Sequence, residues 1–126
     1  MAENPDPGFT SDLSEVIKTL DRAKPMLEPV LESFERSLAK YGADPRSTFW
    51  KNAEWQERRY DILSRLFAEA DRQGGTSITD FGCGYGAFFD YLKDRPVMAA
   101  SRYTGIDISA GMINEAASRI RDTRAK

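Results

Sequence analysis

Apolar residues recur at helical spacing in the first part of the chain. The spacing i, i+3, i+4, i+7 predicts an amphipathic helix that begins near Asp12, which forms a capping box with Glu15. Its apolar positions are Leu13, Val16, Ile17 and Leu20. Pro25 and Pro29 each remove an amide donor and disfavour a helical residue before them. We therefore expect the helix to stop or kink between Ala23 and Glu28.

Two further helical patterns follow. One runs through Val30, Leu31, Phe34 and Leu38, and Gly42 is placed to end it as a C-terminal cap. The other begins at Asn52, whose side chain suits an N-cap, and ends before Gly74 and Gly75. Its expected apolar stripe consists of Trp55, Ile62, Leu63, Leu66, Phe67 and Ala70. We expect amphipathic helices that pack against the rest of the molecule.

The pattern changes after Gly75. Residues 77–81 and 102–107 read as strands, residues 87–93 as a helix, and Ser109 caps a last helix. The order β, α, β, α favours a parallel sheet with right-handed crossovers. The expected organisation is a loose tail over 1–10, a helical region over 11–73 and an α/β domain over 74–126.

Composition narrows the possible functions. The 126 residues include 20 acidic and 18 basic side chains, a net charge of −2, one cysteine and no histidine. A Cys/His zinc site and a catalytic triad with a histidine base are therefore excluded. No long basic stripe points to nucleic acid, and no apolar run is long enough to cross a membrane. We expect a cytoplasmic protein.

The segment most informative about chemistry joins the first expected strand to the next helix. It reads Asp80-Phe81-Gly82-Cys83-Gly84-Tyr85-Gly86. Its three glycines let the backbone adopt positive φ and approach a ligand closely, and amides at the following helix start would face that ligand. Asp107 stands 21 residues after the last glycine, at the end of the second strand, where a carboxylate can bind both ribose hydroxyls. We expect a nucleotide-like ligand.

The residues around the glycines indicate which ligand. A dinucleotide fingerprint needs its third glycine one place later, where this chain has Ala87, which that fingerprint also tolerates. Asp80 distinguishes a dinucleotide from a partly cationic ligand, because a carboxylate so close to the glycine turn would repel a pyrophosphate and attract a cationic group. The position of Cys83 near a helix start also invites a nucleophile or redox interpretation, but it has no resolving partner and small residues fit there.

These two strand ends resemble the first two motifs of class I S-adenosylmethionine-dependent methyltransferases. The similar runs are residues 78–86 (ITDFGCGYG) and 103–109 (YTGIDIS). The resemblance implies a Rossmann-like fold and S-adenosylmethionine as cofactor. It implies that Asp80 holds the methionine ammonium and that Asp107 binds the ribose hydroxyls. It also implies that Ile108 packs on the adenine. The turn that lines the methionine and ribose would consist of Gly82, Cys83, Gly84 and Gly86.

An upstream run is similar to a lead-in of some bacterial members of this family. It comprises Tyr41-Gly42, Trp50, Gln56, Arg59 and Tyr60. The resemblance suggests that Trp50 or Arg59 closes over the cofactor, with Arg59 pairing with its carboxylate. The alternative is that Trp50 anchors the core and Arg59 is a solvated helix residue.

Only 40 residues follow Gly86, whereas the resembled fold has seven strands. We expect the chain to stop before the third strand, as part of a longer enzyme or with a partner chain completing an incomplete sheet. Unpaired strand edges then favour a homodimer. The acceptor and the catalytic residues are not identified, and the isolated chain is expected to be inactive. Two alternatives are an NAD- or FAD-binding oxidoreductase fragment and a non-enzymatic interaction module.

Overall fold

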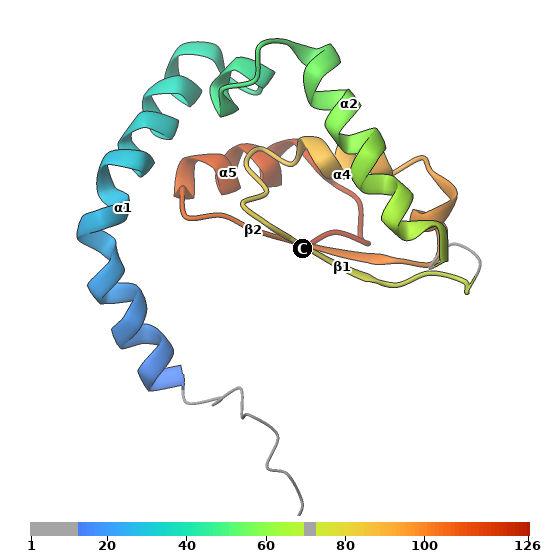
Figure 1. Cartoon of the computed structure of the whole chain (residues 1–126), viewed down its shortest axis with the longest axis horizontal. Helices are drawn as coiled ribbons and strands as arrows, with labels where there is room; N and C mark the ends of the chain where they lie inside the picture. The colour runs from blue at the N-terminus through green and yellow to red at the C-terminus, as the bar shows by residue number, and fades with distance from the viewer. Residues whose placement is uncertain (1–12, 70–72) are drawn as a thin grey trace, which may run out of the picture. The chain divides into compact units, whose positions relative to one another are not determined.

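A computed structural model describes residues 13–69 and 73–126 (Figure 1). The expected tail over residues 1–10, the capping role of Asp12 and the packing of Ala70 lie outside the described residues. The chain divides into two compact units, one up to Val30 and the other from Leu31 to Lys126. Every helix and strand after the first helix belongs to the second unit.

The first helix is longer than its prolines suggest. Helix α1 runs from Leu13 to Tyr41 as one element, with Pro25 and Pro29 inside it (Figure 1). The helix therefore does not stop between Ala23 and Glu28, so that part of the prediction is wrong, whereas the predicted kink stays a prediction. Gly42 ends the helix as predicted, with φ of 66° and its amide donating to the Leu38 carbonyl at 2.7 Å. No helix among the described residues is long and apolar enough to cross a membrane.

The second helical region consists of three short elements. They are the 3₁₀ turn η1 (Pro45–Thr48), helix α2 (Ala53–Ser64) and the 3₁₀ turn η2 (Arg65–Phe67). Asn52 caps α2 as predicted, since its side chain accepts from the Trp55 amide at 3.1 Å.

The apolar stripe predicted for α2 is partly wrong. Trp55, Ile62 and Leu66 are exposed, whereas Leu63 and Phe67 pack on the core. The face that turns inward follows the spacing Gln56, Tyr60, Leu63, Phe67. A polar residue at its start hides this stripe in the sequence, because Gln56 is buried through a hydrogen bond to Tyr85.

The α/β part follows the predicted order. Strand β1 (Ser77–Phe81) is followed by α4 (Ala87–Leu92), the 3₁₀ turn η3 (Pro96–Ala99), strand β2 (Arg102–Ile106) and α5 (Ala110–Arg119). The strands pair in parallel from Ser77↔Arg102 to Phe81↔Ile106. Ser109 caps α5 as predicted, accepting from the Met112 amide at 3.1 Å.

The end of the chain lies along the outer edge of β2. Ala125 forms a parallel bridge to Tyr103, and the Gly105 amide donates to the Lys126 carbonyl at 2.9 Å. Among the described residues the sheet has two strands, and this bridge lies outside them. The hydrogen bonds of residues 124–126 partly occupy this edge of β2.

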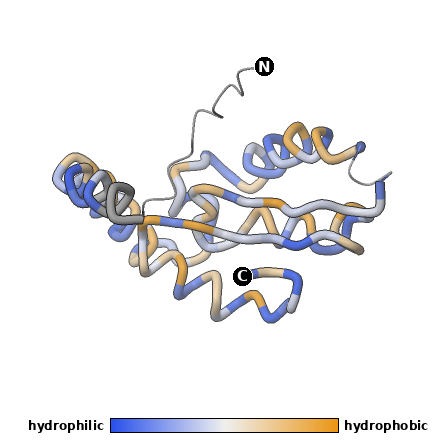
Figure 2. Tube along the Cα trace, turned by 90° about the horizontal axis from the view of Figure 1, so that it is seen from below, coloured by the Kyte–Doolittle hydropathy of each residue, from blue (hydrophilic) through white to orange (hydrophobic). Residues whose placement is uncertain are grey.

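The core lies between the sheet, α2 and α4. The helices alternate apolar and polar segments along their length (Figure 2), as amphipathic packing requires. Phe89, Leu92 and Met98 are fully buried, with Ile78 of β1 and Tyr103 of β2 facing them. The opposite face of the two strands is exposed.

Candidate functional site

The two parallel strands bring the predicted site residues to one edge of the sheet. Phe81 and Ile106 are register partners at the last position of their strands. Asp80 and the turn over 82–86 belong to the end of β1, and Asp107 and Ile108 directly follow β2. Carboxyl ends of parallel strands are where open α/β sheets bind ligands. Seven of the nine predicted residues are therefore neighbours on this edge.

The glycine turn is held to β2 through backbone hydrogen bonds. The amides of Gly82 and Cys83 both donate to the Ile106 carbonyl, at 2.7 and 3.0 Å. Gly82, Gly84 and Gly86 have φ values of 84°, 55° and 87°, a region that favours glycine. A side chain at Gly86 would meet Ile120 Cδ1 at 2.4 Å, whereas the space beside Gly82 is open. The turn therefore favours glycine for its conformation at all three positions, and a Cβ at Gly86 would also require the end of the Ile120 side chain to move.

Asp107 connects the two loops of the site. Its Oδ2 accepts from the Gly84 amide at 2.8 Å, and its Oδ1 accepts from the Ser109 amide at 2.9 Å. One donor belongs to the turn after β1 and the other to the start of α5. The spacing of Asp107 predicts ligand binding, but it does not reveal that the same carboxylate organises the glycine turn.

Asp80 is held by a tyrosine of the neighbouring strand. The Tyr103 hydroxyl donates a hydrogen bond to Asp80 Oδ2. Burial raises the pKa of Asp80, the bond from Tyr103 opposes that rise, and the charge of Asp107 adds to it. Tyr103 itself is buried, and desolvation followed by the Asp80 bond raises its hydroxyl pKa. The sequence does not single out Tyr103, although its inward position in β2 could have suggested a partner for Asp80.

Cys83 is protected from reaction as a nucleophile. Burial raises the pKa of its thiol to about 11, and the charges of Asp107 and Asp80 act in the same direction. Its Sγ lies 2.8 Å from where a Cβ on Gly105 would stand, so the absence of a side chain there makes room for it. At neutral pH the group is a neutral thiol that fills space in the turn.

Tyr85 fixes the turn from its inner side. Its side chain is 4% exposed, and its hydroxyl accepts a hydrogen bond from Gln56 Nε2 at 3.1 Å. Arg119 of α5 donates to the Tyr85 carbonyl at 3.1 Å and pairs with Asp90 at 2.8 Å. From its position in the turn, Tyr85 could contact a ligand or cover the turn, and its burial favours the second role. Gln56 and Arg119 are contacts that no motif predicts.

The segment before α2 also reaches the glycine turn. Thr48 Cγ2 would lie 3.4 Å from a Cβ on Gly84, which is ordinary van der Waals distance for a close neighbour. The 3₁₀ turn η1 therefore lies beside the middle of the glycine turn. This contact places the α1 to α2 connection next to the candidate site.

The Trp50 and Arg59 side chains contact each other. The Arg59 guanidinium stands 5.8 Å from the centre of the Trp50 ring, a cation–π distance. Trp50 is half-buried and Arg59 is exposed. Among the described residues, neither has a hydrogen bond or a ring contact to the glycine turn. The structure thus brings these two predicted residues to each other and not directly to the other seven.

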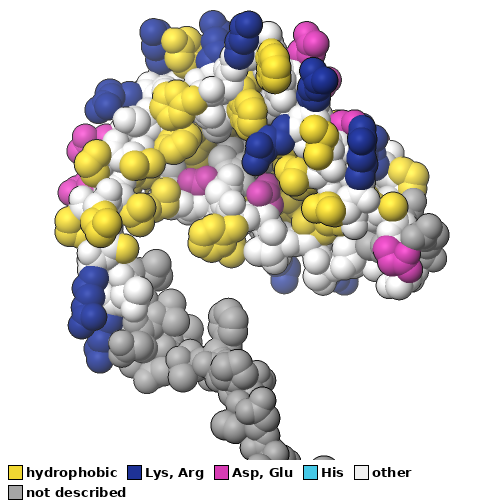
Figure 3. Space-filling model, viewed as in Figure 1, with side chains coloured by type: hydrophobic (Ala, Val, Ile, Leu, Met, Phe, Trp, Pro, Cys, Tyr) yellow, Lys and Arg dark blue, Asp and Glu magenta, His cyan; other side chains and the backbone are white. Residues whose placement is uncertain are grey.

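Apolar side chains are exposed around the same edge of the sheet. Ile108 is 51% exposed, and the register partners Phe81 and Ile106 are 86% and 42% exposed. The space-filling view shows acidic side chains separated by backbone and apolar surface in the middle of this face (Figure 3). The edge therefore combines two carboxylates, a turn rich in backbone amides and an apolar surface, a set suited to a nucleoside that also carries a cationic group.

Comparison with known proteins gives two matches. Residues 78–126 match the family described as "Methyltransferase domain". A segment of 43 residues is 54% identical to a protein of Mycobacterium tuberculosis (strain ATCC 25618 / H37Rv) named "Putative methyltransferase Rv1506c". That segment is 34% of this chain, and it spans only a quarter (25%) of the relative's length. No solved structure matches the chain.

Proposed function

We propose, because residues 78–126 match the methyltransferase domain family, that this edge of the sheet binds S-adenosylmethionine for methyl transfer. The observation that carries the proposal is the pair of carboxylates, Asp80 and Asp107, beside a glycine turn whose backbone is tied to β2. The acceptor and the catalytic residues are left unassigned.

The arrangement of Asp107 supports a role in ribose binding. Each of its oxygens already accepts one backbone N–H, from Gly84 or Ser109. A carboxylate offers about four acceptor positions, so each oxygen can accept one further bond. Two ribose hydroxyls would match this remaining capacity. Because the two amides fix the carboxylate, no rotamer freedom is lost when it binds.

The charge around the turn supports a cationic ligand. Asp80 is half-buried, and Asp107 is close enough to raise its pKa. Two neighbouring carboxylates are relieved of mutual repulsion by an ammonium or sulfonium group, whereas a pyrophosphate would add to the repulsion. This argument favours S-adenosylmethionine over NAD or FAD, the alternative that shares a glycine turn.

The remaining predicted contacts are apolar or peripheral. The exposed Ile108 side chain follows Asp107 and offers an aliphatic surface for an adenine ring. Gly82, with open space where a Cβ would stand, leaves its backbone accessible to the methionine part. Of the two upstream residues, we include Arg59, which stands over the Trp50 ring, as the one that closes over the cofactor and faces its carboxylate.

The chemistry requires positioning more than acid or base catalysis. When bound, the cofactor would supply a methyl group on a sulfonium, which would pass to the acceptor's nucleophile and leave a neutral thioether. The residues of this chain would hold the donor and orient it, which can provide much of the rate enhancement without histidine.

Isothermal titration with S-adenosylhomocysteine tests the proposal. We expect Asp107→Ala to weaken binding by about 1.5–3 kcal/mol, the range for hydrogen bonds to a charged group. The matched control is Asp94→Ala, which removes an exposed carboxylate that follows the end of α4 opposite to the glycine turn. Circular dichroism and urea unfolding of both variants separate loss of binding from loss of fold, because Asp107 also holds the Gly84 and Ser109 amides.

Three outcomes would contradict the proposal in different ways. Equal loss of affinity in both variants would remove Asp107 from the site. Displacement of S-adenosylhomocysteine by NAD in a thermal-shift assay would favour the oxidoreductase alternative. No binding by the folded chain would contradict cofactor binding by these residues and favour an interaction module.

A further inference from the structure

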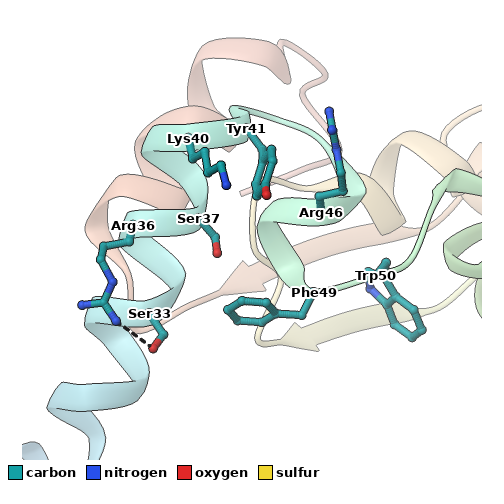
Figure 4. Close-up of a pocket in the computed structure, with 8 residues that line it drawn as sticks. All are labelled: Ser33, Arg36, Ser37, Lys40, Tyr41, Arg46, Phe49 and Trp50. Carbon is teal, nitrogen blue, oxygen red and sulfur yellow. Dashed lines mark hydrogen bonds between the residues drawn. The ribbon is translucent and has the colours of Figure 1, made fainter.

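A concave site lies beside η1, and neither Asp80 nor Asp107 lines it. It is an open pocket of about 420 Å³ between the last turns of α1 and the segment that follows them (Figure 4). Its size is within the range of small-molecule sites. Its lining residues are Ser33, Arg36, Ser37, Lys40, Tyr41, Arg46, Phe49 and Trp50. All of them belong to the unit that starts at Leu31.

The pocket is basic although the chain as a whole is slightly acidic. Residues 36–51 contain four basic side chains and one acidic side chain, against 18 and 20 in the whole sequence. Basic side chains gather over the α1 to α2 connection in the space-filling view (Figure 3). Three of these cations, Arg36, Lys40 and Arg46, line the pocket itself. Such a local excess favours an anionic ligand.

The three cations differ in how far they are neutralised. Arg46 pairs with Asp44, its Nε at 2.8 Å and its Nη2 at 3.1 Å, and this pair lowers the pKa of Asp44. Arg36 lies 3.7 Å from Glu32. Lys40 has no carboxylate partner among the described residues, and its Nζ stands 4.9 Å from the centre of the Tyr41 ring. Lys40 is therefore the cation most available to a bound anion.

The other side of the pocket is aromatic and conformationally unusual. Phe49 is 60% exposed, and among the described residues it is the one non-glycine with positive φ, 63°. A bulky residue there is strained, and such strain is common at ligand sites. Two hydrogen bonds hold the strained turn, from the Phe49 amide to the Arg46 carbonyl and from the Trp50 amide to the Pro45 carbonyl. Phe49 and Trp50 line this side of the pocket, and the Phe49 ring is turned toward α1 (Figure 4), where its centre lies 5.0 Å from that of the Phe34 ring.

We propose that this pocket binds a small planar compound bearing a carboxylate or a phosphate, with Lys40 and Arg36 on the anion and Phe49 and Trp50 on the ring. The identity of this compound as the methyl acceptor rests on the proposed function. Thr48 joins the two sites, since η1 lines the pocket through Arg46 on one side and reaches Gly84 on the other. The anion would anchor the acceptor away from Asp80 and Asp107, leaving its other end free to reach the donor.

The test uses Trp50 as a reporter. In a Trp55→Phe background, Trp50 is the remaining tryptophan, because the chain has two. We expect phenyl phosphate or benzoate to change its fluorescence saturably, and benzyl alcohol, which has the ring without the charge, to bind at least tenfold more weakly. The ratio of the two anions identifies which oxyanion the pocket prefers. Lys40→Gln should weaken both anions at least tenfold.

Lys51→Gln is the matched control. It removes the same charge one residue after Trp50, from a side chain that is exposed and does not line the pocket, so affinity should change less than twofold. Equal effects of the two lysine variants, or equal binding of benzyl alcohol and the anions, would overturn the proposal. Absence of any saturable change would overturn it as well.

Titration of S-adenosylhomocysteine separates this inference from the proposed function. We expect phenyl phosphate to bind equally well with and without saturating S-adenosylhomocysteine. Competition between the two would overturn a separate acceptor pocket while leaving cofactor binding intact. Cofactor binding without anion binding would refute the pocket alone, whereas anion binding without cofactor binding would refute the proposed function and the acceptor role that rests on it.

Discussion

The two sides of η1 hold their charged groups in opposite ways. On the sheet edge, Asp80 and Asp107 are fixed by hydrogen bonds from Tyr103 and from backbone amides. Around the pocket, Lys40 and Arg46 lie over the Tyr41 ring, at 4.9 and 4.7 Å from its centre. The carboxylates are positioned by directional bonds in a half-buried turn. Arg46 is also bonded to Asp44, whereas Lys40 has only its contact with the half-buried Tyr41 ring.

This difference indicates how each side tolerates change. Directional bonds to buried groups are costly to leave unmade, whereas a cation over an exposed ring is stabilised by about 0.5–1 kcal/mol and keeps its hydration. We expect substitutions on the sheet edge to alter both fold and affinity. Substitutions around the pocket should alter affinity with little effect on unfolding.

The largest expected effect is at Gly86. Gly86→Ala imposes a side chain at φ of 87° and a Cβ 2.4 Å from Ile120 Cδ1, so the free energy of unfolding should fall by about 2–4 kcal/mol. Gly82→Ala has a similar φ of 84° and open space, so it should cost only the strain of about 1–2 kcal/mol. Urea unfolding measures both. Equal losses would show that Ile120 moves aside without cost.

The reactivity of the Cys83 thiol measures how strongly the turn disfavours a thiolate. With its pKa raised to about 11, thiolate forms only as pH rises toward that value. Alkylation by iodoacetamide at pH 8 should be roughly 100-fold slower than in the urea-unfolded chain, and should accelerate up to about pH 11. A rate that levels off near pH 9 would contradict the burial described for this thiol.

Tyr103→Phe removes the donor to Asp80 and keeps the ring. Because that bond lowers the Asp80 pKa, its loss should raise the pKa further. Affinity for S-adenosylhomocysteine should fall by about 1.5–2 kcal/mol, and the loss of binding with falling pH should begin at a higher pH than in the unmodified chain. Tyr91→Phe, in the same aromatic cluster, is the control and should leave the titration profile unchanged.

The smallest effect is expected at two adjacent arginines. Arg59 and Arg58 both lie 5.8 Å from a tryptophan ring, Trp50 and Trp55 respectively, and both are exposed. If Arg59 faces the cofactor carboxylate, Arg59→Ala should weaken S-adenosylhomocysteine binding by about 0.5–1 kcal/mol and Arg58→Ala should not. Isothermal titration of both variants decides, and unchanged affinity in Arg59→Ala would leave it a solvated residue.

The sheet edge could be predicted from sequence because its signals are local. A strand, a turn that needs glycine and a carboxylate at the next strand end are each recognisable within a few residues, and parallel pairing brings them together. Asn52, Ser109 and Gly42 were likewise predictable as helix caps, since capping depends on one side chain or one φ value.

The features that the sequence does not predict depend on tertiary contacts. Gln56 conceals the inward face of α2, since a polar residue enters the core only because the Tyr85 hydroxyl meets it. The two prolines of α1 suggest a helix end that the structure does not have, since the helix continues through both of them. The pocket gathers residues 33–50 from a helix end and a strained turn, and the positive φ of Phe49 has no signature in the sequence.

The double attachment of Asp107 also has a kinetic consequence. The amide protons of Gly84 and Ser109 are bonded to the two oxygens of one side chain, although they lie 25 residues apart. Opening either loop frees the carboxylate that holds the other. Both protons should therefore exchange with deuterium through a shared opening event, so that these two loops, separate along the chain, fluctuate as one cooperative unit.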